Sequence, residues 1–146
     1  MRQRSSCLTK CALYYQDGVR YNDPKWAWWV DDCELAWHEG MAQLDLGNPR
    51  AAVEQFERSV AATAVHQVRS RYLHLGYLLG GQASVGAWRD AEATMHQLMP
   101  LVGEVASTRT TVLLGKLLPK PTTAVAPDST RDTAEQLQLT LRCTDA

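Results

Sequence analysis

The sequence predicts an all-α protein in which antiparallel helical hairpins stack as a short solenoid. Apolar residues recur at steps of three and four between residues 34 and 64, which is the spacing of one face of a helix. Gly47, Asn48 and Pro49 interrupt this pattern with the residues of a tight turn between two helices. A similar segment follows further along the chain, with Gly86 at the position of Gly47. The periodicity, the turn chemistry and the second copy together predict the fold class.

Each position of the first turn has a suitable residue. Gly47 favours the left-handed backbone conformation that closes a helix, and Asn48 is a good cap for the next helix. Pro49 suits the first helical position, because its missing N–H needs no partner there. The matches between the two copies are the turn glycine, an arginine, a small alanine and a large apolar residue. These pairs are Gly47 and Gly86, Arg50 and Arg89, Ala52 and Ala91, and Phe56 and Met95. All four pairs have the same spacing in the sequence, which we call the repeat interval.

The spacing of small and large residues resembles the tetratricopeptide repeat, a pair of helices that recurs about every 34 residues. In that family a Gly or Ala lets the first helix of a repeat approach the second. Gly40 and Ala52 lie at such positions here, twelve residues apart. Ala36 and Gln43 replace the usual Trp and Tyr, and the repeat interval is five residues longer than in that family. We therefore expect degenerate repeats.

The chain ahead of the hairpin has two parts. Residues 1–18 favour a short helix, so residues 1–22 are expected to form a partial N-terminal helix and a linker. Asp23 and Pro24 are a helix-start signal, which predicts a long helix from there to Leu46. Four tryptophans lie in this segment, and we expect them to wedge the hairpin against its neighbour rather than to form an aromatic cage. They are Trp26, Trp28, Trp29 and Trp37.

Four further helices are expected after the first turn. Glu54 and Arg58 are spaced to pair on the solvent face of the first of these. Gly80 and Gly81 lie inside the second, which indicates either a neighbouring helix at close range or a weakened helix. Pro100 is expected to end or bend the third. The four helices are predicted at residues 50–63, 67–85, 88–99 and 107–118, with buried faces that include Ala52, Val53, Phe56 and Val60, then Tyr72, Leu75, Leu79 and Ala83, then Ala91, Met95 and Leu98.

Residues 119–146 have the composition of a flexible C-terminal tail. Pro119, Pro121 and Pro127 stand among Thr, Ala, Asp and Ser residues, which disfavours a packed core. The final EQLQLTLRC alternates like a strand and is also compatible with one or two helical turns. The repeat domain is therefore predicted at residues 23–118.

Composition excludes several classes of function. The net charge of −1 and the pI of about 6.4 argue against the strongly basic surface of a nucleic-acid-binding protein. The N-terminus lacks the apolar run of a secretory signal, and no stretch reaches the roughly 18 apolar residues of a membrane span. We expect a cytoplasmic protein that does not associate with membranes.

No motif for catalysis or metal binding stands out. Cys7 and Cys11 lie one helical turn apart, but a structural zinc site needs four ligands and the sequence offers no second pair. The four histidines are scattered, and the sequence has no nucleophile motif and no phosphate-binding loop. We therefore expect a non-catalytic protein without a cofactor or metal.

Arginines on the predicted helices are the best candidates for contacting a partner, because guanidinium groups bind carboxylates with two parallel hydrogen bonds. Arg69 and Arg71 fall on the first helix of the second hairpin, the element that lines the concave face in tetratricopeptide arrays. Tyr72 and Trp37 complete the set of predicted partner-binding residues. Intrahelical pairing is the commoner role of such arginines.

Two longer segments resemble the C-terminal sensor region of bacterial helix-turn-helix transcriptional regulators of the XRE type. They are WAWWVDDCELAWHEGMAQLDLGNPRAAVEQF, with Trp26, Trp29, Asp31, Glu34 and Leu35, and YLLGGQASVGAWRDAEATM, with Gly86 to Glu92. The resemblance covers about residues 20–118 and implies repeats that bind a peptide, a protein or a second copy. Residues 1–22 are too short for the DNA-binding domain of that family, so we expect no direct nucleic-acid binding by this chain.

The main hypothesis is a helical-repeat interaction or sensor module of a transcriptional regulator, which binds a protein or peptide on its concave face and has the capacity to self-associate. One alternative is a small-molecule, thiol or metal sensor that uses Cys7, Cys11 and the tryptophans. The other is a truncated regulator fragment without independent activity.

Overall fold

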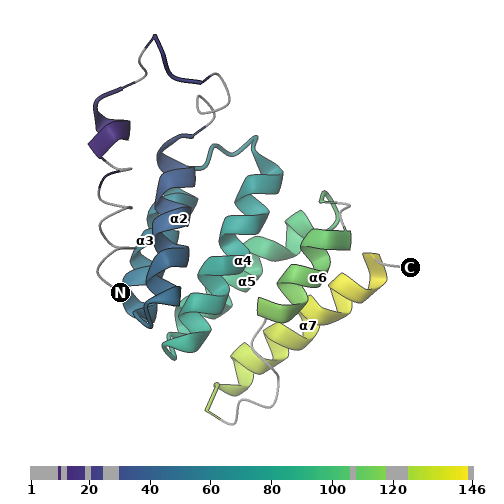
Figure 1. Ribbon diagram of the computed structural model, residues 1–146. Coiled ribbons are helices and arrows are strands. Elements are labelled where there is room, and N and C mark those ends of the chain that lie inside the picture. Colours follow the sequence, from purple (N-terminus) through teal and green to yellow (C-terminus); the bar gives the residue numbers. More distant parts are fainter. Residues whose placement is uncertain are drawn as a thin grey trace. The chain divides into compact units, whose positions relative to one another are not determined.

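The computed structural model describes residues 10, 13–18, 21–24, 30–105, 108–117 and 125–144. Every regular element in these residues is a helix, so the all-α prediction is confirmed for them. The long helices follow one another along the chain with short connections (Figure 1). None of them is long and apolar enough to cross a membrane. They are α2 (Asp32–Asp45), α3 (Pro49–Ala62), α4 (Val68–Ser84), α5 (Trp88–Val102), α6 (Thr108–Leu117) and α7 (Asp128–Thr144).

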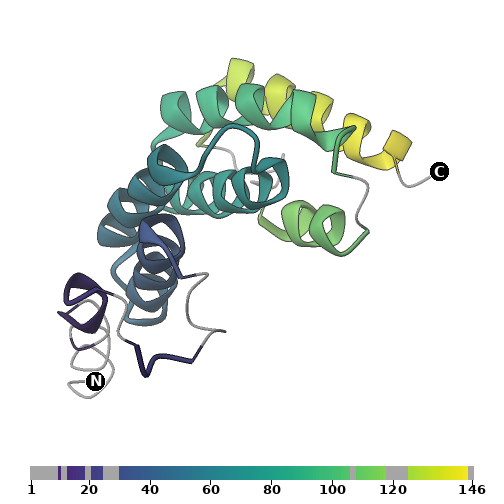
Figure 2. The same ribbon diagram turned by 90° about the horizontal axis from the view of Figure 1, so that it is seen from above.

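The helices divide between two compact units. The first, Met1–Ala62, contains α2 and α3, which pack against each other as a hairpin. The second, Thr63–Ala146, contains α4 to α7. In this second unit α5 lies between α4 and α7 in contact with both, and α6 packs beside α4 (Figure 2).

Helix α2 begins later than the sequence predicts. Asp31 is its N-cap, and one Asp31 carboxylate oxygen accepts a hydrogen bond of 3.0 Å from the backbone N–H of Glu34. Asp23 and Pro24 lie outside any helix, so the predicted start there is wrong. Of the four tryptophans, Trp26, Trp28 and Trp29 lie outside the described residues, and Trp37 is on α2.

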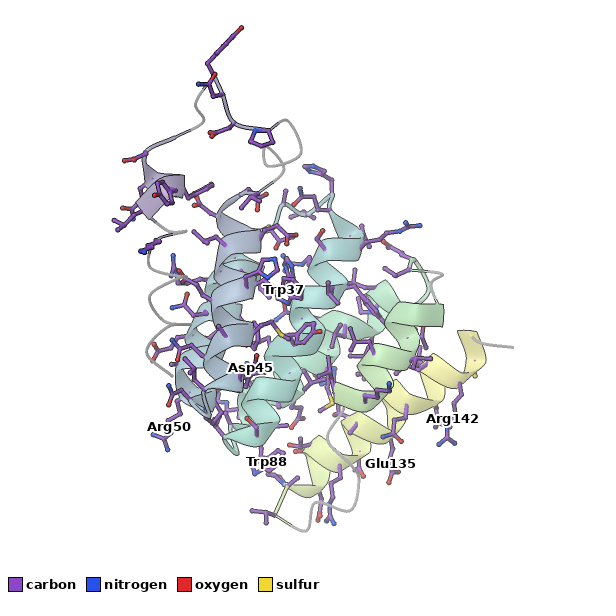
Figure 3. All side chains as sticks on the ribbon, viewed as in Figure 1. Trp37, Asp45, Arg50, Trp88, Glu135 and Arg142 are labelled. Atoms are coloured by element: carbon purple, nitrogen blue, oxygen red, sulfur yellow. The ribbon has the colours of Figure 1, made fainter. Side chains whose placement is uncertain are left out.

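The turn between α2 and α3 has the predicted left-handed glycine, and Pro49 is the first residue of α3. The side-chain amide of Asn48 donates to Oε1 of Gln43 at 3.1 Å, and its predicted cap on α3 stays a prediction. Gly47 adopts a left-handed conformation with φ of 76°. Its N–H donates to the carbonyl of Leu44, and the N–H of Asn48 donates to the carbonyl of Gln43, both at 2.9 Å. These two bonds form a Schellman motif, which satisfies carbonyl groups that the helix end leaves without partners. Asp45 and Arg50 lie on either side of this turn (Figure 3).

The turn between α4 and α5 repeats the same geometry one repeat interval later. Gly86 has φ of 72°, and its N–H donates to the carbonyl of Ala83 at 3.2 Å. The N–H of Ala87 donates to the carbonyl of Gln82 at 2.9 Å. Each bond joins positions that match those of the first turn, so the two turns have the same hydrogen-bond pattern.

Close packing of a glycine and an aromatic ring joins α2 to α3. A Cβ atom at Gly40 would lie 2.5 Å from the ring of Phe56, which is itself fully buried. The hydroxyl of Ser59 donates a 2.8 Å hydrogen bond to the carbonyl of Cys33 in the same interface. Nη1 of Arg58 on α3 lies 3.7 Å from Oε2 of Glu39 on α2. An ion pair between the two helices therefore replaces the predicted pair between Arg58 and Glu54.

Buried polar side chains join α4 to its surroundings in the second unit. The hydroxyl of Thr94 on α5 donates to Oε1 of Gln82 on α4 at 2.8 Å. The hydroxyl of Thr63 lies 3.0 Å from Nδ1 of His74, and both residues are buried. Helix α5 continues past Pro100 to Val102, so the predicted end at residue 99 is wrong. A proline near the end of a helix removes only one of its hydrogen bonds.

Glycines on α4 allow α6 to pack closely. A Cβ atom at Gly76 would lie 3.3 Å from Leu114, and a Cβ atom at Gly80 would lie 3.3 Å from Leu117. The sequence leaves two explanations for Gly80 and Gly81 in α4: a neighbouring helix at close range or a weakened helix. The first is observed, because α6 packs closely against Gly80.

The C-terminal residues form a helix, where the sequence predicts a flexible tail. Helix α7 spans 17 residues and packs against α5. Oε2 of Glu92 on α5 accepts hydrogen bonds from the hydroxyls of Ser129 at 3.0 Å and Thr130 at 3.1 Å. Glu135 and Arg142 point outward from the exposed side of α7 (Figure 3). The inner side is buried and consists of Thr130, Thr133, Ala134, Leu137 and Leu141.

Buried positions recur at the repeat interval. In the first helix of each hairpin they are Cys33, Tyr72 and Thr111, then Ala36, Leu75 and Leu114. In the second helix they are Ala52, Ala91 and Thr130, then Phe56, Met95 and Ala134, then Ser59, Leu98 and Leu137. Helices α6 and α7 therefore follow the same burial pattern as the two hairpins before them.

Candidate functional site

The N-terminal turn of α4 carries the two arginines that the sequence singles out. Arg69 is exposed. Arg71 is half-buried, and its Nη2 lies 3.5 Å from Oε1 of Gln97 on α5, the long limit of a hydrogen bond. Within the described part of the chain, neither guanidinium forms an ion pair.

Besides the two arginines, the helix dipole contributes positive potential at the N-terminal end of α4. A helix carries partial positive charge at its N-terminus, where acidic residues are favourable. The first turn of α4 contains no acidic residue, and its N-cap residue Gln67 makes no side-chain capping bond to the helix. Oε1 of Gln67 instead accepts a 3.3 Å hydrogen bond from the N–H of Ala64 in the preceding turn. A carboxylate at this end of α4 would meet the helix dipole, while Arg69 and Arg71, two positions apart in the helix, extend from different sides of it.

An apolar side chain stands beside this positive end in the sequence. Val65 is 82% exposed in the connection that leads into α4, next to the exposed His66. Sequence reasoning misses Val65, because its role depends on exposure rather than on spacing. We include it with Arg69 and Arg71 in the candidate site, called here the α4 N-terminal surface.

The other two predicted residues are placed differently. Tyr72 is only 1% exposed, which agrees with its place in the predicted buried face of this helix. Its ring is therefore not accessible to a partner in this structure. Trp37 is half-buried and belongs to the first unit, where its ring centroid lies 4.6 Å from that of His38 at an angle of 59°. Arg69 and Arg71 share the first turn of α4, and Trp37 lies on α2 in the first unit.

A cluster of titratable groups surrounds the start of α2. Burial alone would raise the pKa of Asp31, but hydrogen bonds from the Cys33 thiol and from the backbone N–H groups of Glu34 and Cys33 lower it below its ordinary value of 3.8. Burial raises the pKa of Glu34, with repulsion from Asp31 adding to it and His38 opposing it. Burial also raises the pKa of Tyr15, and the nearby Asp32 carboxylate adds to this effect.

Among these groups, Asp31 has a structural role as the N-cap of α2. The Asp31 carboxylate accepts a hydrogen bond from the Cys33 thiol, whereas a nucleophilic cysteine needs a positive neighbour that favours the thiolate. Cys33 is also 3% exposed. In residues that the structure describes, no three His, Cys, Asp or Glu side chains gather as a metal site requires. Cys7 and Cys11 lie outside these residues, so the sensor hypothesis stays a prediction.

No protein-family model, curated protein or solved structure matches this chain. The resemblance to XRE-type regulators therefore stays a prediction from the residues that carry it.

Proposed function

We propose that this chain is a non-catalytic helical-repeat module that binds a protein or peptide through the α4 N-terminal surface. The recurrence of buried positions at the repeat interval carries the proposal. Proteins built from stacked helical hairpins bury a continuous core between repeats and use the exposed helix faces for recognition. The matching turns at Gly47 and Gly86 support one repeated unit rather than two unrelated hairpins.

The α4 N-terminal surface suits a partner segment with a carboxylate beside an apolar side chain. Arg69 and Arg71 provide charged donors, the helix N-terminus adds positive potential, and Val65 offers exposed apolar area. A hydrogen bond to a charged group contributes about 1.5–3 kcal/mol, so each arginine that makes one should change the affinity by about ten- to a hundredfold. An acidic C-terminal peptide segment is the simplest ligand with this chemistry.

The experiment is a fluorescence-polarisation screen of the full chain against peptides that end in a free carboxylate, with the amidated peptides as a paired set. Binding should require the carboxylate, and Arg69→Ala and Arg71→Ala should each weaken it by about tenfold or more. Arg89→Ala is the matched control, because Arg89 is also an exposed arginine near the start of a helix. Equal binding by all three variants would move the site away from α4.

We further propose, from the resemblance alone, that the module serves a transcriptional regulator whose DNA-binding domain lies outside residues 1–146. A mobility-shift assay of this chain on operator-like duplexes should then show no retardation at physiological salt. Retardation by the chain alone would contradict this assignment, since specific operator binding by this family requires the helix-turn-helix domain.

A further inference from the structure

Gly76 on α4 and Gly115 on α6 occupy matching positions, one repeat interval apart, but have different surroundings. A Cβ atom at Gly76 would lie 3.3 Å from Leu114 and 3.7 Å from Leu117, both on α6. Among the described residues, none lies within 4 Å of a Cβ atom placed at Gly115, and Gly115 is exposed. No described residue therefore fills, on α6, the position that receives the next helix on α4.

The contact between α4 and α6 shows what this position accepts. Helix α6 presents Leu114 and Leu117, one turn apart on the same face, to the glycines of α4. Leu114 is 2% exposed in this contact. A glycine lacks the Cβ atom that would hold the two helices apart, so leucine side chains from the second helix fill the space directly above its backbone.

The open face of α6 has an apolar side chain in the same register. Val112 lies three positions before Gly115, hence on the same face of the helix, and is 50% exposed. Lys116 is exposed at the edge of this face. We call Val112, Gly115 and Lys116 the α6 open face.

We propose that the α6 open face docks an amphipathic helix of a partner protein that presents two leucines three residues apart. The occupant follows from continuity with the α4 interface, since the α6 open face repeats the position at which α4 already holds such a helix. This surface is separate from Arg69 and Arg71, so the inference does not rest on the proposed function of the α4 N-terminal surface.

The test uses the full chain and a stapled helical peptide with the α6 sequence TRTTVLLGKL, whose leucines are the pair that α4 accepts. Nuclear magnetic resonance shift changes should centre on Val112 and Gly115. Gly115→Leu fills the open face without meeting any described neighbour and should weaken binding by about tenfold, because its side chain would occupy the space that a leucine of the peptide needs. Circular dichroism should show that the variants keep their helices.

Two control variants test whether binding requires this face. Gly103→Leu also adds a side chain where nothing lies within 4 Å but is outside the face, so it should bind like the parent chain. Arg69→Ala should also bind normally, even if the proposed function of that surface is wrong. Absence of binding, or equal binding by Gly115→Leu, would overturn the proposal. If the parent chain forms dimers without the peptide and Gly115→Leu abolishes them, the occupant of this face is a second copy of the chain, which would also overturn the proposal.

Discussion

Replacement of Gly40 by alanine should destabilise the first unit, although alanine is the better helix former. Gly40 lies inside α2, where alanine stabilises a helix by about 1 kcal/mol relative to glycine. The added Cβ would lie 2.5 and 2.6 Å from two ring carbons of Phe56, about 1 Å inside the usual carbon–carbon contact distance. Steric repulsion therefore opposes the gain in helix propensity.

The sign of the effect depends on whether the ring can move. Phe56 is fully buried, so it has no solvent-filled space into which to shift. Overpacking of a filled core costs about 1–3 kcal/mol, and the overlap with two atoms places Gly40 in the upper part of this range. The net loss of unfolding free energy should be about 1–2 kcal/mol once the gain in helix propensity is subtracted.

Urea unfolding followed by far-ultraviolet circular dichroism measures this free energy. Gly115→Ala is the matched control, because Gly115 lies inside α6 with open space around it and should gain about 1 kcal/mol. Gly76→Ala, with a Cβ 3.3 Å from Leu114, should fall between the two. If Gly40→Ala stabilises the chain as much as Gly115→Ala does, the close packing of α2 on Phe56 is refuted.

Two other predictions concern α2 and α7. Asp31→Ala removes the N-cap of α2 and should cost about 1 kcal/mol at neutral pH. Because the folded state lowers the pKa of Asp31, this stabilisation is complete above its ordinary pKa of 3.8 and is lost as the pH falls through the lower folded value. Unfolding curves of parent and variant should therefore converge in strong acid, and a difference independent of pH would exclude a charged cap. Leu137→Ala, in the fully buried face of α7, should cost about 2–5 kcal/mol in thermal or urea unfolding. The exposed Leu139→Ala is its control, and equal small effects of both changes would mean that α7 is not part of the folded core.

The sequence predicts α2 to α5 well because their signals are local and strong. Gly47 and Gly86 mark the two turns, and large apolar residues such as Phe56 and Met95 mark the buried faces. The start of α2 is harder to place, because Asp23 and Pro24 form a stronger isolated signal than Asp31. The better signal is Glu34, three residues after Asp31, which is the spacing of a capping pair.

Helix α7 escapes prediction because small polar residues fill much of its buried face. Thr130, Thr133 and Ala134 give weak apolar periodicity, and the hydroxyl contacts with Glu92 form only when α5 is already in place. The repeat interval is the available signal for α7, since Ala134 lies one interval after the buried Met95.

The candidate site is predictable only in part. The sequence identifies Arg69 and Arg71 as cations near the start of one helix. Their lack of ion pairs among the described residues depends on tertiary structure, as does the exposure of Val65.

The constant interval between buried positions has a consequence for how the chain tolerates changes in length. Removal of the segment from Ala52 up to Ala91, or from Ala91 up to Thr130, joins two parts that bury the same face of a helix. A recombination event at such points would delete or duplicate one pair of helices and keep the matching buried positions in phase. Insertions of other lengths within a helix would rotate the downstream face away from its neighbours, because each added residue turns it by about 100°.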